Sequence, residues 1–208
     1  MAAFLGNLRN VVITSFVIAL LLVGVYCGTQ GFDGMTFELF VLRWLHVVAG
    51  VMWIGLLWYF NFVQIPTMPR VPAELKGGVT GYIAPAALFW FRWGAMATLV
   101  FGIILALRNH YLVEAYTLDL SEGAAGWPVV PKYLAIGIGM WMATIMWFNV
   151  WFVIWPNQQK ALNIGGKFPD LTADQKAAAA KNAMMFSRVN TLLSIPMLFS
   201  MVAASHLY

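Results

Sequence analysis

The stretch FVLRWLHVVAGVMWIGLLWYFNF, from Phe40 to Phe62, decides the fold class because it is long and apolar enough to cross a bilayer. An α-helix of about 20 mostly apolar residues spans the hydrocarbon core. Four other stretches share this character, so we expect five spans, at about residues 10–28, 38–63, 84–107, 132–155 and 183–207. The sequence therefore predicts an all-α integral membrane protein, a bundle of five transmembrane helices that forms a single domain over residues 1–208.

The composition supports this prediction. Hydrophobic residues make up 62% of the chain and charged residues 10%, whereas a soluble domain carries about a quarter charged residues. The sequence contains no phosphate loop, no C-x-x-C-H haem attachment motif and no H-E-x-x-H zinc motif. Cations that flank membrane helices explain the net charge of +4. We expect the lipid bilayer as partner, no nucleic acid, and a multi-pass location in the bacterial inner (cytoplasmic) membrane.

The distribution of cations predicts the orientation. Cytoplasmic flanks of membrane helices are enriched in Lys and Arg. With the N-terminus in the cytoplasm, only three cations lie near the outer side, namely Arg43, Arg108 and Lys132. Eight then lie on or near the inner side: Arg9, Arg70, Lys76, Lys160, Lys167, Lys176, Lys181 and Arg188. We therefore expect a cytoplasmic N-terminus, an outer C-terminus, and a cytoplasmic linker at 156–182 whose last part is helical. The other long linker covers 108–131.

The histidines give the first functional hypothesis, because this orientation places all three of them on the outer side. An ionisable side chain within a span indicates function, and imidazole is an axial ligand of haem iron. Arg43, His46 and Gly50 share one helical face at spacings of three and four residues. We predict that His46 and His206 ligate haem b, that Arg43 pairs with a propionate, and that Gly50 leaves room for the flat macrocycle.

An alternative explanation needs no cofactor. In it, His46 bonds a neighbouring helix, Arg43 extends to the lipid headgroups and Gly50 allows two helices to approach closely. His110 is expected in a solvated loop, and Arg92 is expected to stack on Trp90 or Trp93. The remaining polar residues of the spans are expected to form an inter-helix polar layer: Asn61, Gln64, Asn149, Arg188 and Asn190.

Four stretches resemble a known family. LRWLHVVAGVMWIGLLWYFNF, FRWGAMATLVFGIILAL, TIMWFNVWFVIWPNQQKAL and NTLLSIPMLFSMVAASHLY are similar, in this order, to blocks of the membrane domain of bacterial membrane-bound urate hydroxylases. The resemblance covers the chain from about residue 40 and implies a haem or redox role for His46 and His206. Family members usually continue into an external cytochrome c domain, so we expect a short form without it. At the positions of Gly137 and Val189, members of this family often have a histidine. The absence of these two histidines weakens any expectation of urate chemistry.

Two functions remain open from the sequence. The first is a membrane redox protein that binds haem b near the outer membrane face and passes electrons to a quinone or an external cytochrome c. The second is a non-catalytic structural subunit of a larger respiratory, photosynthetic or oxygenase membrane complex. His46, His206 and Gly50 favour the first function, and the two replaced histidines favour the second. The sequence identifies no catalytic residues.

Overall fold

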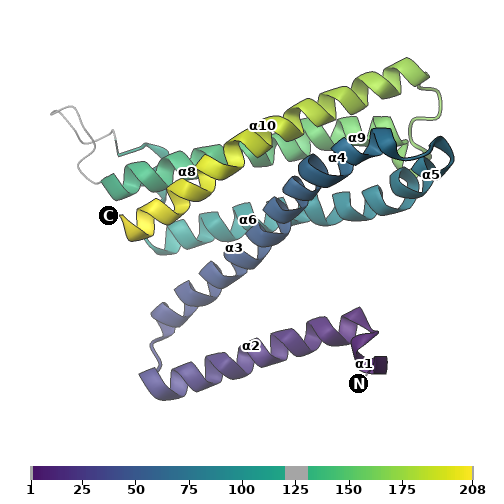
Figure 1. Cartoon of the computed structure of the whole chain (residues 1–208). Coiled ribbons are helices and arrows are strands. Elements are labelled where there is room, and N and C mark those ends of the chain that lie inside the picture. Colours follow the sequence, from purple (N-terminus) through teal and green to yellow (C-terminus); the bar gives the residue numbers. More distant parts are fainter. Residues whose placement is uncertain (1, 120–130, 208) are drawn as a thin grey trace. The chain divides into compact units, whose positions relative to one another are not determined.

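The computed structural model describes residues 2–119 and 131–207, and over these ranges the chain is helical and contains no strand. Five of its helical stretches are long and apolar enough to cross a membrane, which confirms the predicted number of long apolar helices. Figure 1 shows these stretches as the long ribbons of the molecule. Membrane crossing itself, and the side on which each end lies, stay predictions. Residues 120–130 of the predicted 108–131 linker lie outside the described ranges.

The contacts divide the chain into two units, residues 1–41 and 42–208. The boundary falls inside a continuous helix, α3 (Gly34–Trp58). Since an unbroken helix joins the two units, the division does not decide whether residues 1–208 form the predicted single domain. Each unit is described separately below.

The first unit contains α1 (Ala2–Leu5), α2 (Leu8–Gln30) and the first turns of α3. The Asn7 side chain caps α2 by accepting hydrogen bonds from the backbone amides of Arg9 and Asn10. The start of α3 is held similarly, because Asp33 Oδ2 accepts from the Thr36 amide at 2.8 Å. Hydrogen bonds from the Thr36 side chain and from its backbone amide lower the pKa of the Asp33 carboxyl. None of the α2 side chains that the structure describes is buried.

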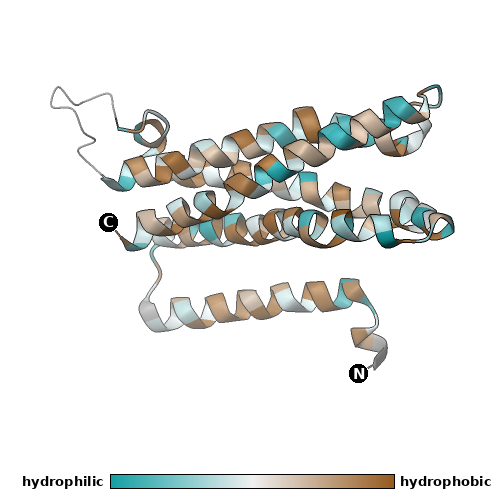
Figure 2. Ribbon diagram, turned by 45° about the horizontal axis from the view of Figure 1, so that its top comes forward, coloured by the Kyte–Doolittle hydropathy of each residue, from teal (hydrophilic) through white to brown (hydrophobic). Residues whose placement is uncertain are grey.

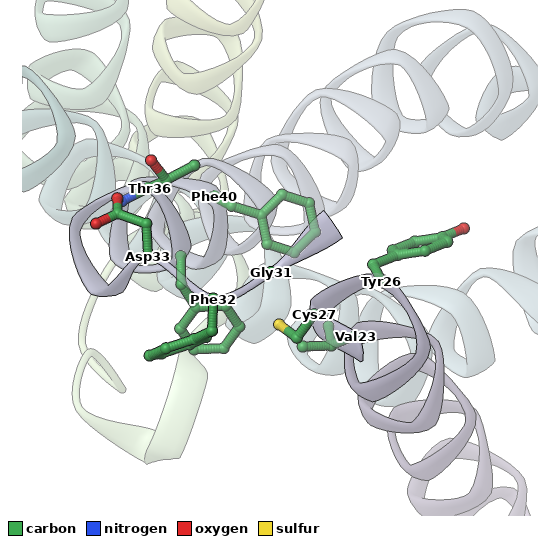
Figure 3. A pocket seen from close by; sticks show the side chains of 9 residues that line it. Val23, Tyr26, Cys27, Gly31, Phe32, Asp33, Thr36 and Phe40 are labelled. Carbon is green, nitrogen blue, oxygen red and sulfur yellow. The ribbon is translucent and has the colours of Figure 1, made fainter. Parts of the chain in front are cut away.

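A mostly apolar pocket of about 590 Å³ lies between the end of α2 and the start of α3 (Figure 3). Tyr26 and Cys27 contribute to it from α2, and Phe40 contributes from α3. Asp33 and Thr36 are the polar residues at its α3 side. All of its lining residues belong to the first unit: Val23, Tyr26, Cys27, Gly31, Phe32, Asp33, Thr36, Phe37 and Phe40.

In the second unit each helical stretch is longer than the span predicted within it. The second span continues from α3 through η1 (Tyr59–Gln64), α4 (Ile65–Thr67) and η2 (Met68–Arg70). The third joins α5 (Ala73–Gly78), η3 (Val79–Ile83) and α6 (Ala84–Arg108). The fourth joins α8 (Pro131–Phe148), η4 (Asn149–Ile154) and α9 (Trp155–Leu162). These helices continue beyond the predicted spans through segments that mix polar and apolar residues, and the boundaries of the membrane spans stay predictions.

Two short helices and one long helix complete this unit: α7 (Leu112–Tyr116), η5 (Ile164–Gly166) and α10 (Ala173–His206). Thr172 and Gln175 form a reciprocal capping box at the start of α10. The helix begins ten residues before the expected span, which confirms that the last part of the 156–182 linker is helical.

The second unit is held together by a seam along α10, which packs against α8, η4 and α9. Most of the buried residues of α10 are small or polar: Ala179, Ala183, Ser187, Asn190, Ser194, Met197, Ala203 and Ala204. Small residues let membrane helices approach closely. The larger core side chains come mostly from the other helices, including Trp53, Leu57, Phe91, Met146 and Ile154. Hydrophobic residues also run along the outer faces of all the long helices (Figure 2).

The predicted polar layer exists and links three spans. Asn149 Nδ2 donates to Asn190 Oδ1 at 2.9 Å, and Asn190 Nδ2 donates to the Met146 carbonyl at 2.9 Å. Asn61 Nδ2 donates to Ser187 Oγ at 2.8 Å. Arg188, which was expected in this layer, is exposed instead because its helical position faces away from the seam.

Candidate cofactor site

His46 lies between two helices and is anchored by one ring nitrogen. Its Nδ1 is 2.8 Å from the backbone carbonyl oxygen of Thr98 on α6. Because a carbonyl oxygen can only accept, this hydrogen bond requires the proton to be on Nδ1. The lone pair of Nε2 is then available to a ligand. Histidines that bind metals are commonly oriented in this way, with the second ring nitrogen donating to a carbonyl.

Gly102 provides the space in which the His46 ring lies. A Cβ atom at Gly102 would be 2.9 Å from Cε1 and 3.0 Å from Nδ1 of His46. Real Cβ atoms do not come this close to other heavy atoms, so the imidazole occupies the space that a side chain at position 102 would need. Gly102 and Thr98 therefore form a shaped support for the ring on α6.

The same α6 face accepts α3 along its length. At Gly94, a Cβ atom would be 3.3 Å from the Trp53 backbone nitrogen and 3.5 Å from the Ala49 carbonyl oxygen. Gly94, Thr98 and Gly102 follow each other at intervals of four residues in GAMATLVFG, so they share one helical face. The sequence interpretation missed this stripe, although small residues at this spacing are a recognised signal of close helix packing in membranes.

Gly50 faces α6, one turn along α3 from His46. A Cβ atom at Gly50 would lie 3.8 Å from Thr98 Cγ2, which is an ordinary van der Waals contact. Gly50 is therefore on the predicted face, beside Thr98, and the site could accept a methyl group there. Its predicted role in leaving room for a macrocycle stays a prediction.

Arg43 is exposed and lies near a tyrosine of the α6–α7 connection. Burial raises the pKa of the Tyr111 phenol, and the positive charge of Arg43 offsets part of this rise. The Tyr111 ring also stacks on Tyr133 of α8, with ring centroids 6.1 Å apart. The guanidinium thus lies at the same end of the bundle as His46, where an anionic group could reach it.

His206 is exposed on the last turn of α10. Trp58 Nε1 donates to Ser194 Oγ at 3.0 Å, and together with the Asn61–Ser187 bond this shows that α3–η1 and α10 run antiparallel as neighbours there. His46 precedes Trp58 by twelve residues, and His206 follows Ser194 by twelve residues. Because the two helices run antiparallel, both histidines are at one level of the bundle. Within ranges 2–119 and 131–207, no hydrogen bond joins the two histidines, and their pairing stays a prediction.

The other sequence predictions concern single residues. His110 is exposed in a turn and has a left-handed φ of 57°, in agreement with the predicted loop position. Arg92 does not stack on Trp90 or Trp93 as expected; its guanidinium lies 3.7 Å from the ring centroid of Trp155. This partner belongs to another span and could not be inferred from sequence proximity.

The described residues form no site in which several side chains could hold a metal ion. The described part of the chain has no group of three or more His, Cys, Asp or Glu side chains that could hold an ion. Haem is a different case, because the porphyrin supplies four of the iron ligands and a single histidine can bind the iron. The anchored imidazole of His46 fits that requirement.

Comparison with known proteins gives one match. No curated protein and no solved structure matches the chain. Residues 130–207 match the family model described as "Urate oxidase N-terminal". The matched part contains α8, η4, α9 and α10, and therefore His206, whereas Arg43, His46 and Gly50 precede it. Through these residues, the chain is linked to the urate oxidase N-terminal family.

Proposed function

We propose that the chain is a membrane redox protein whose helix bundle binds haem b through His46 and passes electrons to a quinone or an external cytochrome c. The observation that carries this proposal is the His46–Thr98 hydrogen bond. It fixes the imidazole against α6 and leaves Nε2 for an iron atom. The same bond is also expected in the cofactor-free alternative, in which His46 only links two helices, and haem binding separates the two explanations.

The neighbouring residues support binding at this end of the bundle. Arg43 lies one helical turn from His46 and is exposed, so it can pair with a propionate. His206 is proposed as the second axial ligand because it lies at the level of His46. Bound haem would supply one-electron redox chemistry. The chain itself orients one ligand through the Thr98 carbonyl and provides a cation for the propionate.

The test is the optical spectrum of the purified protein, expressed with a sufficient haem supply. We expect a b-type spectrum in the wild type, its loss in His46→Ala, and its retention in His110→Ala, which removes an exposed imidazole at the same end of the bundle. His206→Ala should change the spin state of the iron without emptying the site. A colourless wild-type protein would refute the proposal.

A second candidate function is supported by α2. None of the described side chains of this apolar helix is buried, and an apolar helix of this length can pack against lipid or a partner subunit. In this proposal the chain is a non-catalytic subunit of a larger respiratory, photosynthetic or oxygenase complex in the bacterial inner membrane. A colourless protein that co-purifies stoichiometrically with such a complex would favour this function.

A further inference from the structure

Arg92 is a cation within the third apolar helical stretch, and it lies among aromatic rings from two helical segments. Its guanidinium is 3.7 Å from the ring centroid of Trp155 on α9 and 5.7 Å from that of Phe89, one turn earlier on α6. The Trp93 ring connects these residues, because its centroid is 6.4 Å from that of Phe89 and 5.3 Å from that of Trp151 in η4. We call Arg92 and these four rings the arginine–aromatic cluster.

The guanidinium of Arg92 has no hydrogen-bond acceptor among residues 2–119 and 131–207. Within these ranges it makes the two ring contacts, but no hydrogen bond and no ion pair. A guanidinium carries five N–H donors. Attraction to the face of a ring stabilises its charge but supplies no oxygen acceptor. The cluster therefore holds a positive charge in place and leaves its donors for a group from outside the described chain.

The arginine–aromatic cluster is accessible from outside the bundle. Arg92 itself is half-buried, at the edge of the face that α6 packs against the core. Phe89 and Trp93, which flank it on the outer side of α6, are 45% and 47% exposed. A molecule at the surface of the bundle can thus reach the guanidinium, and an apolar chain attached to that molecule can pack against the exposed rings.

The position of Arg92 along α6 fits the level of the lipid headgroups on the predicted cytoplasmic side. Arg92 precedes Arg108, the last residue of α6, by 16 residues, which is about 24 Å at about 1.5 Å per residue. With Arg108 at the outer surface of a hydrocarbon core about 30 Å thick, and the helix along the membrane normal, Arg92 is about 6 Å from the inner surface. A long basic side chain can extend its charge over such a distance to the headgroups.

A phosphate is the acceptor that suits a guanidinium at this level. Its oxygens match the fork of N–H donors and can accept two hydrogen bonds at once. The cytoplasmic leaflet is also the leaflet that carries anionic lipids. In a zwitterionic lipid the headgroup's own cation offsets the phosphate charge, so an anionic phospholipid complements Arg92 better.

We infer that the arginine–aromatic cluster binds the phosphate of an anionic phospholipid in the cytoplasmic leaflet, with the phosphate on the guanidinium and an acyl chain against the rings. The inference rests on the predicted membrane crossing and needs no haem. Lipid binding can be measured whether or not the purified protein is coloured, so failure of this inference and failure of the haem proposal are distinguishable.

The first test measures the melting temperature of the whole chain in detergent with added phosphatidylglycerol or phosphatidylcholine of the same acyl chains. We expect a larger rise with phosphatidylglycerol, and we expect Arg92→Gln to lose this difference. Arg188→Gln is the matched control, because Arg188 is exposed on α10 and makes no ring contact among the described residues. It should keep the difference. An undiminished difference in Arg92→Gln, or an equal loss in Arg188→Gln, would overturn the inference.

The second test counts retained lipids by native mass spectrometry. After exposure to equal amounts of the two lipids, the wild type should retain phosphatidylglycerol in preference to phosphatidylcholine. Arg92→Lys keeps the charge without the planar fork and should retain less phosphatidylglycerol than the wild type. Equal retention of the two lipids by the wild type would refute the inference without any variant. Inorganic phosphate that stabilises the wild type as much as phosphatidylglycerol would show a site for the free anion and would also overturn it.

Discussion

At the residue scale, Gly102 determines whether His46 can keep its position. Gly102→Ala would place a methyl group 2.9 Å from Cε1 of the imidazole, so the ring must move and its bond to Thr98 should break. Overpacking costs about 1–3 kcal/mol. We expect a lower melting temperature and, if haem binds here, a lower haem content in the purified protein.

Gly50→Ala is the matched control for Gly102→Ala. It adds the same methyl group one turn from His46, but at 3.8 Å from Thr98 Cγ2, where the contact is ordinary. This variant should keep the melting temperature of the wild type, whereas a loss of haem from it would support the predicted role of Gly50 in leaving room for the macrocycle. Equal losses of melting temperature in the two variants would mean that Gly102 has no special relation to the His46 ring.

Tyr111 should make the bundle sensitive to alkaline pH. Burial raises its pKa above the ordinary value of 10.0, so the folded state holds the phenol proton more tightly than the unfolded state. This contribution to stability is complete below pH 10 and is lost as the pH rises through the raised pKa. The melting temperature should therefore fall above about pH 10, and this fall should be smaller in Tyr111→Phe.

Tyr82→Phe provides the comparison, because Tyr82 is 81% exposed. Its removal should leave the alkaline fall as large as in the wild type. If Tyr111→Phe and the wild type lose stability in parallel, the buried phenol is not the responsible group.

The residues of the candidate cofactor site differ in how visible they are in the sequence. Arg43 and His46 could be identified because a cation and an imidazole are rare in an apolar span. Thr98 acts through its backbone carbonyl and Gly102 through the absence of a side chain, so neither has a chemical signal of its own. Both residues contact His46 only because α3 packs against α6 in the folded chain, and this packing cannot be inferred from the sequence of either helix.

At the element scale, α7 depends on a glycine of α8. A Cβ atom at Gly137 would collide with the carbonyl oxygen of Ala115, a buried residue of α7. Gly137→Ala should therefore displace α7 and lower the free energy of unfolding by about 1–3 kcal/mol or more. Gly55→Ala, with no heavy atom within 4 Å of the added Cβ, is the control. Similar unfolding curves for the two variants in detergent would contradict this role.

The helices themselves were largely predictable, and their ends were not. Five apolar runs correctly gave five long helices because hydrophobic length is a strong signal. The second helical stretch continues past residue 63 because the mixed polar and apolar residues from Gln64 to Arg70 remain helical. The π-helical segments were also missed, since their wider turns leave no mark in hydropathy.

At the scale of the whole molecule, the cation asymmetry predicts a cytoplasmic N-terminus. A reporter that is active only in the periplasm should be active when fused after residue 120 and inactive when fused after residue 168. A cytoplasmic reporter at the same two positions should show the reverse pattern. Periplasmic activity at 168 alone would invert the proposed topology.

The length of α10 has a practical consequence. At about 1.5 Å per residue, its 34 residues measure about 51 Å, whereas the hydrocarbon core of a bilayer is about 30 Å thick. Its exposed large hydrophobic side chains begin only at Met185, so the first twelve residues of the helix carry none. This segment packs on the rest of the bundle through the buried Ala179 and Ala183, and its outer face should lie in water outside a detergent micelle. An antibody fragment raised against it would give electron microscopy a fixed marker on a particle otherwise hidden in detergent.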